Sequence, residues 1–166
     1  MGLSTHYRTE RLTLRPVAAT DEAAVVAGVG DLAVSGWLAV VPHPYTASDF
    51  RAFQTTYAVA GETFAVDDAA GFAGIIGVED GILGYWIAPH AQGRGYATEA
   101  ARCLVAAHFA VTVTPLISGY FEGNERSAKV LAKLGFVEVG RDLKHCRARA
   151  ADLPHVVLHL ARRDFV

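Results

Sequence analysis

The sequence has few of the residues that mark disulfide-rich or metal-binding proteins. Its 166 residues include two cysteines, Cys103 and Cys146, which supply neither a disulfide framework nor the paired-cysteine spacing of a zinc site. Among the histidines, His155 and His159 alone have a ligand-like spacing, and on a strand they would stand about 13 Å apart. We therefore expect a reducing compartment and no metal.

The chain also lacks an excess of either charge and an apolar run near its start. Lysine and arginine number 15 and aspartate and glutamate 17, so no basic surface for nucleic acid is expected. The first sixteen residues hold three arginines and no apolar run that fits a signal peptide or a membrane span. These absences predict a cytoplasmic protein with no nucleic-acid partner and no membrane partner.

What the chain does have is enough apolar content for one core. Hydrophobic residues make up 52% and charged residues 19%, and no linker, repeat or low-complexity tract interrupts the sequence. A chain of this length buries roughly two thirds of its unfolded surface. We predict a single domain over residues 1–166, present as a monomer or a homodimer.

Hydrophobic periodicity predicts alternating strands and helices. Strands are expected at 10–17, 62–66, 71–78, 81–88, 116–122, 136–143 and 155–162, and helices at 20–29, 48–60, 97–111 and 124–134. This order favours an α/β (α+β) fold with a single mixed, mostly antiparallel central sheet of about six to seven strands, flanked by about four helices. Residues 30–46, which glycine and proline interrupt, are predicted to form a long irregular loop that lines a site.

The stretch "PHAQGRGYATEA", residues 89–100, places a glycine turn directly before a helix. The first amides of a helix have no internal partners and lie at its positive end, so they form an anion site. Gly93 and Gly95 leave the backbone accessible, and Arg94 can add charge at the rim. The turn fits either a phosphate-bearing ligand or ordinary helix capping. It is not the dinucleotide fingerprint, because it follows a hairpin. It is not a P-loop either, because no Gly-Lys-Ser/Thr is present.

The same residues resemble a known family. Gln92-Gly93-Arg94-Gly95-Tyr96-Ala97 looks like the Q/R-x-x-G-x-G/A motif of the GNAT superfamily of acetyl-CoA-dependent N-acetyltransferases. The blocks "TERLTLRP", "VPHPYTASDFRAF", "LGYWIAPHAQGRGYATEA" and "GNERSAKVLAKLGFVEVG" resemble its RimJ/RimL-like branch, the ribosomal-protein-alanine N-acetyltransferases. That branch acetylates protein N-terminal amines and related small amines, and the blocks cover most of the chain in the same order.

The resemblance implies a GNAT fold with acetyl-CoA as co-substrate. In that family the amides of the loop bind the pyrophosphate of coenzyme A, the preceding strand offers its backbone to the pantetheine, and an asparagine hydrogen-bonds the cofactor arm. The matching positions are Gln92, Gly93, Arg94, Gly95, Tyr96 and Ala97 in the loop, Trp86 and Ile87 in the strand, and Asn124. Ser127, in the helix after Asn124, would lie beside the same arm.

Direct attack of an amine on a thioester needs a neutral nitrogen and a donor for the carbonyl oxygen. An α-amino group, with a pKa of about 8, loses its proton more easily than a lysine, at about 10.4. A backbone N–H near Ile87 is expected to meet the oxyanion. A thiol with a pKa of about 8.5 leaves readily as thiolate, so an acid helps less than in amide hydrolysis.

Two expected catalytic groups are missing. Many GNAT enzymes have a tyrosine acid seven residues after the asparagine, where this chain has Leu131. Ser127 matches the serine proposed as the acid in the ribosomal-protein branch; the alternative is that it hydrogen-bonds a carbonyl or the coenzyme.

The glutamate base of that branch is missing too, and its register falls near Cys146. His145 has a suitable unperturbed pKa for a base, and the alternative is an ordinary surface histidine. Neighbours on a strand point to opposite faces, so His145 and Cys146 are not expected to form a dyad. No base is needed if the amine arrives neutral.

The predicted loop supplies candidates for the acceptor side. Trp37, His43 and Tyr45 are predicted to contact the amine, with core packing as the alternative for the aromatic residues and a simple turn for His43. We expect an N-acetyltransferase that acts on a protein or peptide N-terminal α-amine or on a small-molecule amine. The alternatives are a GNAT-like module that binds acyl-CoA without turnover, as a sensor or interaction domain, and a hydrolase that uses Cys146 and a histidine.

Overall fold

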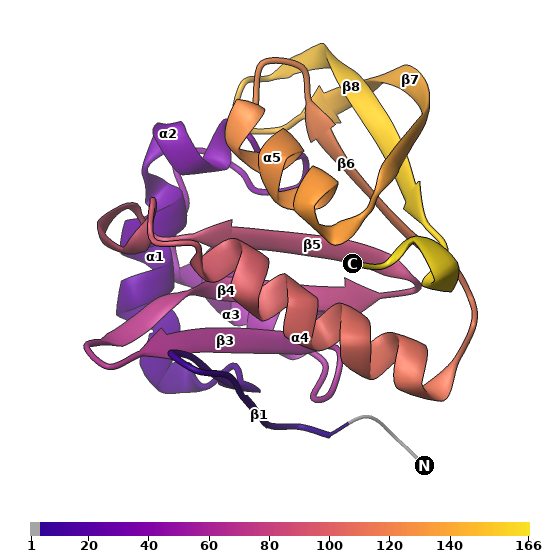
Figure 1. The fold of residues 1–166 in the computed structure, drawn as a ribbon. Coiled ribbons are helices and arrows are strands. Elements are labelled where there is room, and N and C mark those ends of the chain that lie inside the picture. Colours follow the sequence, from indigo (N-terminus) through magenta and orange to yellow (C-terminus); the bar gives the residue numbers. More distant parts are fainter. Residues whose placement is uncertain (1–3) are drawn as a thin grey trace.

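The computed structural model describes residues 4–166 as one sheet of eight strands with helices on both faces (Figure 1). The strands are β1 (Tyr7–Arg8), β2 (Thr13–Pro16), β3 (Thr63–Asp68), β4 (Gly71–Glu79), β5 (Ile82–Ile87), β6 (Leu116–Phe121), β7 (Val137–Cys146) and β8 (Ala151–Leu160). The helices are α1 (Glu22–Gly30), α2 (Leu32–Ser35), α3 (Ala47–Thr56), α4 (Tyr96–Val111) and α5 (Glu125–Leu134). The predicted single domain and the predicted N-terminal stretch both include residues 1–3, which lie outside the described residues. The predicted mixed sheet flanked by helices is confirmed, with eight strands instead of six to seven and five helices instead of four.

The two extra elements are too short to show a hydrophobic period. β1 has two residues and pairs with β2 through Tyr7↔Leu14. α2 is a single turn inside the predicted loop at 30–46, and Asp31 caps it by accepting the Ala33 N–H at 2.8 Å. The prediction of a wholly irregular loop is therefore wrong at this turn.

Among the element boundaries that differ from the prediction, two are explained by a single local residue. α3 begins at Ala47 instead of residue 48, because Thr46 caps it with its side chain. β8 begins at Ala151, four residues early, and runs through Pro154. The Pro154 carbonyl accepts the Glu122 N–H at 2.9 Å, and Glu122 lies one residue beyond the end of β6. An N–H at position 154 would face the same side as this carbonyl. Its absence therefore removes no hydrogen bond to a residue of β6, and the strand tolerates the proline.

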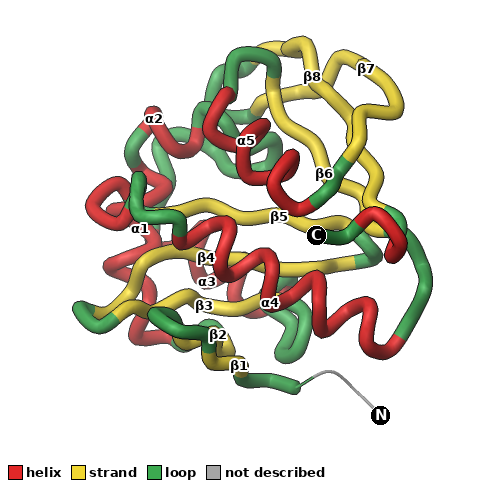
Figure 2. The backbone as a smooth tube through the Cα atoms, in the orientation of Figure 1, coloured by secondary structure: helices red, strands yellow, loops and turns green. Residues whose placement is uncertain are grey.

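The sheet is split between β5 and β6. These two strands are parallel, whereas every other neighbouring pair is antiparallel. β5 and β6 pair only through Ile82↔Ile117, at their amino ends, and diverge beyond it, as Figure 2 shows. Strands β1–β5 thus form one half of the sheet and β6–β8 the other, and the opening lies at the carboxyl ends of β5 and β6.

Helices α4 and α5 cover one face of the sheet and α1 and α3 the other (Figure 1). Because alternate residues of a strand face opposite sides, Leu83, Tyr85 and Ile87 of β5 pack on the α4 and α5 side. Trp86 packs on the side of α1 and α3. The two faces of β5 therefore meet different surroundings at the opening. Among residues 4–166, no helix is both long and apolar enough to cross a membrane.

Candidate active site

The split sheet holds a cavity of about 1200 Å³. It is lined by the edge of β5, the loop before α4, the start of α5, strands β6 to β8 and residues around α2. The predicted site residues in this lining are Trp37, Trp86, Ile87, Gln92, Gly93, Gly95, Tyr96, Ala97, Asn124 and Ser127. Four others, His43, Tyr45, Arg94 and His145, lie outside it.

The loop before α4 presents a run of free amides. Gly93 and Gly95 have φ values of 75° and 79°, a left-handed conformation that favours glycine. The first α4 amide with a partner is that of Glu99, which donates to the Gly95 carbonyl at 3.0 Å. The amides from Gly93 to Thr98 have no acceptor among residues 4–166. They lie at the positive end of a sixteen-residue helix and form an anion site on the cavity wall.

Positive side chains on α5 face this loop. Arg126 donates to the Gln92 side-chain oxygen, and the Gln92 amide nitrogen donates to the Ile87 carbonyl at 2.9 Å. Arg126, Lys129 and Lys133, spaced three and four residues apart on one helix face, all line the cavity. Arg94 instead lies 3.9 Å from Asp68, outside the lining. The sequence pattern pointed to Arg94 and missed the α5 cations, which helical spacing could have found once α5 was placed beside the loop.

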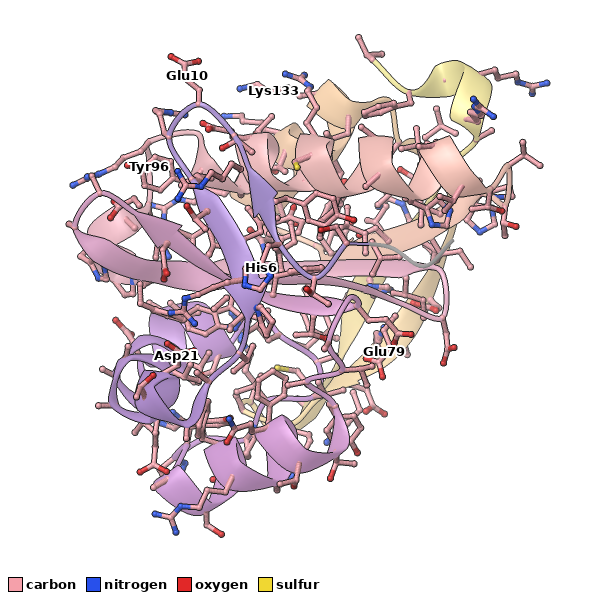
Figure 3. The ribbon with its side chains drawn as sticks, turned by 90° about the horizontal axis from the view of Figure 1, so that it is seen from below. His6, Glu10, Asp21, Glu79, Tyr96 and Lys133 are labelled. Atoms are coloured by element: carbon pink, nitrogen blue, oxygen red, sulfur yellow. The ribbon has the colours of Figure 1, made fainter. Side chains whose placement is uncertain are left out.

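Arg11, in the turn between β1 and β2, fixes the same loop from outside. It donates to the Arg94 carbonyl at 2.9 Å and to Glu99 at 2.7 Å, and its guanidinium lies 5.0 Å from the centre of the Tyr96 ring. Figure 3 shows Tyr96 beside this turn, which carries Glu10 at its tip. Burial raises the pKa of Glu99, but hydrogen bonds from Thr9 and Arg11 outweigh it and leave that pKa below its usual value.

The edge of β5 is open along the cavity. The Ala88 N–H donates to Ala73 on β4, so the backbone groups of Leu83, Tyr85 and Ile87 point the other way, toward β6. Two bonds confirm that direction: the Leu83 carbonyl accepts from a β6 serine hydroxyl at 2.9 Å, and the Ile87 carbonyl accepts from Gln92.

Between these two bonds, both backbone groups of Tyr85 and the Ile87 N–H have no partner among residues 4–166. The predicted free backbone at Trp86 is turned toward β4 instead, because Trp86 is paired with Ile75. The Trp86 ring packs 5.8 Å from that of Phe72. A backbone able to pair with an extended ligand is therefore offered by Tyr85 and Ile87.

Two hydroxyl groups meet where α5 begins. The Asn124 side-chain oxygen accepts the Ser127 N–H at 3.3 Å and caps the helix. The Ser127 hydroxyl lies 2.8 Å from the hydroxyl of Tyr85, and burial raises the pKa of Tyr85 to about 12 despite that hydrogen bond. Leu131, at the position of the expected tyrosine, is fully buried. Tyr85 could not be singled out from the sequence, because strand alternation places it on the helix-covered face without showing what its hydroxyl contacts.

A second wall of the cavity is built from residues around Trp37. The hairpin between β7 and β8 holds this segment: the buried Cys146 thiol lies 3.6 Å from the Gly36 carbonyl, and the Arg147 N–H donates to Ala39 at 3.0 Å. The Arg149 guanidinium lies 4.4 Å from the centre of the Trp37 ring. Cys146 is thus enclosed beneath the segment and is absent from the cavity lining.

The remaining predicted residues lie elsewhere. His145, with 59% of its side chain exposed, pairs with Asp152 at 2.7 Å near the end of the β7–β8 hairpin. Tyr45 packs against the core beside α1 and α3, where burial raises its pKa to about 12. His43 is exposed. The structure therefore does not bring His43, Tyr45 or His145 to the cavity.

The free amides, the α5 cations and the open strand edge together form a site suited to an extended ligand with an anionic end. A family model described as "Acetyltransferase (GNAT) domain" matches residues 11–137, most of the chain. The chain therefore belongs to the GNAT acetyltransferases, as the sequence motif predicts. No curated protein gives a significant match.

Solved structures share the fold. A GNAT-family acetyltransferase from Bacillus anthracis superposes with a TM-score of 0.82 at 20% identity, over 95% of this chain and 99% of that one. The ribosomal-protein-S5-alanine acetyltransferase from Vibrio fischeri gives 0.75 at 20% identity, over 97% and 98%. Mycobacterium smegmatis RimJ, solved in complex with CoA-disulfide, gives 0.73 at 23% identity, over 92% and 82%. At these identities the likeness shows the GNAT fold alone.

Proposed function

We propose that the protein transfers an acetyl group from acetyl-CoA directly to a primary amine, either a protein or peptide N-terminal α-amine or a small-molecule amine. The observation that carries the proposal is the meeting of two backbone sites in one cavity. The free amides at the start of α4 and the open edge of β5 both line it.

The residues present fit the pyrophosphate and the pantetheine arm of coenzyme A. The amides from Gly93 to Thr98 and the Arg126 guanidinium suit the negatively charged pyrophosphate. The backbone of Tyr85 and Ile87 suits the amide groups of the pantetheine arm, as one strand suits another. The Asn124 side-chain nitrogen, which has no acceptor among residues 4–166, faces the same cavity.

The thioester supplies an activated acetyl group, and the protein's own groups serve its transfer. The Ile87 N–H is free to donate to the carbonyl oxygen as that oxygen gains charge. Ser127, which lies within hydrogen-bond distance of the neutral Tyr85 hydroxyl, would donate to the departing sulfur. Because a thiol has a pKa of only about 8.5, this second donor contributes less than the first.

The test is release of free thiol from acetyl-CoA in the presence of peptide N-termini, polyamines and aminoglycosides, with mass spectrometry to identify the acetylated amine. Calorimetry with coenzyme A reports binding separately from turnover. Coenzyme A binding together with thiol release for at least one amine class supports the proposal. Binding without release for any amine would instead support the module without turnover, and failure to bind would remove both.

A further inference from the structure

His155, whose spacing from His159 resembles that of a metal-ligand pair, lies in the lining of the cavity. His155 of β8 is 8% exposed, and its Nδ1 lies 2.9 Å from a carboxylate oxygen of Asp142 on β7. Both residues line the cavity. The ring also packs edge-to-face against Phe121, with 5.6 Å between centroids. The contacts with Asp142 and Phe121 thus hold the imidazole in one orientation.

The strand register places His155 at the level of the candidate reaction centre. Counting from the one pair between β5 and β6, Ile82↔Ile117, four residues on each strand bring Trp86 level with Phe121. Phe121 is paired with His155 on β8. Alternation puts Trp86, Phe121 and His155 on one face of the sheet, opposite the face that carries α4 and α5. α4, whose preceding loop is proposed to bind the acetyl donor, lies on that opposite face. His155 therefore lies on the face that remains for the acceptor amine.

The ring points across the sheet toward the split. A methyl group added at Gly119 of β6 would lie 2.5 Å from both Nε2 and Cε1 of His155, so the imidazole leans over that glycine toward β5. Gly119 is a position where any side chain would displace the histidine. The Nδ1 edge of the His155 ring faces away from Gly119, toward Asp142 on β7.

The carboxylate fixes which nitrogen is free. An ionised Asp142 only accepts hydrogen bonds, so the proton of a neutral His155 resides on Nδ1 and Nε2 carries the lone pair. Nε2 has no hydrogen-bond partner among residues 4–166. Every fully buried side-chain nitrogen or oxygen among these residues has a hydrogen-bond partner. Because Nε2 has no partner, it is not fully buried and solvent can reach it. An accessible, unprotonated nitrogen therefore faces the acceptor side.

We propose that His155 is the catalytic base that removes a proton from the acceptor ammonium, with Asp142 as its positioning residue. This inference rests on the proposed function. His155 Nε2 takes one proton from R–NH3+, and the freed lone pair of the amine forms the C–N bond to the acetyl carbon. The C–S bond then breaks with its electron pair on sulfur, and a second proton from nitrogen goes to that thiolate, directly or through Ser127. The products are the acetamide, free coenzyme A and a protonated His155, which releases its proton to solvent.

The same hairpin contains a second pair with the same chemistry in a different place. His145 and Asp152 lie 2.7 Å apart but are 59% and 67% exposed and lie outside the cavity lining. His159 lies on β8 as well, four residues from His155 on the same face, and is exposed outside the lining. His145 is therefore the competing base, and His159 is a matched control with no access to the cavity.

The test compares His155→Gln with His145→Gln and His159→Gln in the full chain. We expect His155→Gln to lower kcat for thiol release about 10²- to 10⁴-fold, with the affinity for coenzyme A unchanged. His159→Gln should keep wild-type kcat. Asp142→Asn, which keeps the shape but lets either tautomer form, should give a smaller fall in kcat at unchanged coenzyme A affinity. Wild-type kcat in His155→Gln, or a large loss in His145→Gln instead, overturns the proposal.

A measurement without turnover keeps the proposal testable if His155→Gln fails to fold. Nitrogen-15 NMR of the wild-type protein, with the Asp142→Asn spectrum to help assign the ring, reports which nitrogen of neutral His155 is protonated. We expect the Nδ1–H form, and an Nε2–H form overturns the proposal. Failure of the proposed function shows differently, in the wild-type protein itself, which would bind coenzyme A without releasing thiol for any amine or would not bind coenzyme A at all.

Discussion

One wall of the cavity, which we call the donor wall, is built mainly from main-chain groups, and the other, the acceptor wall, from side chains. The donor wall consists mainly of main-chain groups: the amides from Gly93 to Thr98 and the edge of β5. The acceptor wall consists of side chains, among them Trp37, Phe121 and His155. A main-chain site needs glycine at left-handed positions and the start of a helix, and both occur within one short stretch. A side-chain site can be assembled from residues far apart in the sequence.

The largest expected effect on coenzyme A affinity comes from a change in the donor wall. At Gly95, φ is 79°, so a valine there would strain the backbone by about 1–3 kcal/mol and displace the loop amides. We expect Gly95→Val to lower the affinity for coenzyme A by tenfold or more, measured by calorimetry. Gly71→Val is the matched control, because Gly71 has φ of 122° in the β3–β4 turn, outside the cavity. Equal affinity loss in both variants would mean that strain alone, and not the cradle, weakens binding.

A smaller effect on coenzyme A affinity distinguishes two arginines. Arg94 was predicted from the sequence, and Arg126 lines the cavity. A charge-assisted hydrogen bond contributes about 1.5–3 kcal/mol, and partial exposure reduces that for Arg126. We expect Arg126→Gln to weaken coenzyme A binding by about tenfold, and the loss to shrink at high salt. Arg94→Gln, outside the cavity lining, should change it less. A larger loss for Arg94→Gln would restore the role that the motif assigned to it.

These two arginines show what could be predicted from the sequence. The loop motif, the helix start and the β5 hairpin are local, so pattern and resemblance could single out Gly93 and Gly95, and both line the cavity. That this loop binds coenzyme A stays a prediction. Arg126 entered that wall only because α5 packs beside the loop, and periodicity does not report which helices are neighbours.

In the acceptor wall, Trp37 was predicted from the sequence and lines the cavity, but His155 could not be predicted, for the same reason. His145 and His155 are both histidines on one hairpin, and both pair with an aspartate. Which of them faces the cavity depends on strand register and on the small residue at Gly119. The resemblance to the family pointed to the strand around His145 because it aligned the chain to a base that this sequence lacks. Long-range register had to be seen before the two could be told apart.

A still smaller effect concerns the acceptor wall alone. Trp37 lines the cavity between the Arg149 guanidinium and Gly123, whose added methyl would lie 3.7 Å from the ring. We expect Trp37→Ala to raise KM for the acceptor amine several-fold while the affinity for coenzyme A stays unchanged, because the ring is not part of the donor wall. Steady-state kinetics and calorimetry measure the two effects separately. Tyr57→Ala, an exposed aromatic outside the lining, is the control.

The smallest expected effect concerns Tyr85, a side chain within the main-chain donor wall. Burial raises the pKa of Tyr85 and of Tyr45 from 10.0 to about 12. The unfolded tyrosines ionise near 10, and the folded ones stay neutral until about 12. The contribution of these two tyrosines to the free energy of unfolding should therefore be constant below about pH 10 and fall as pH rises toward 12.

Phenylalanine at either position should reduce that alkaline fall, and urea unfolding at pH 7 and pH 11 measures it. At pH 7 the two variants should differ, because Tyr85→Phe also loses the hydrogen bond to Ser127, which contributes about 0.5–1.5 kcal/mol. Tyr45→Phe should cost less at pH 7. Equal stability of both variants at pH 7 would show that the Tyr85 hydroxyl contributes nothing to the folded state, and its role as a donor behind Ser127 would lose its support.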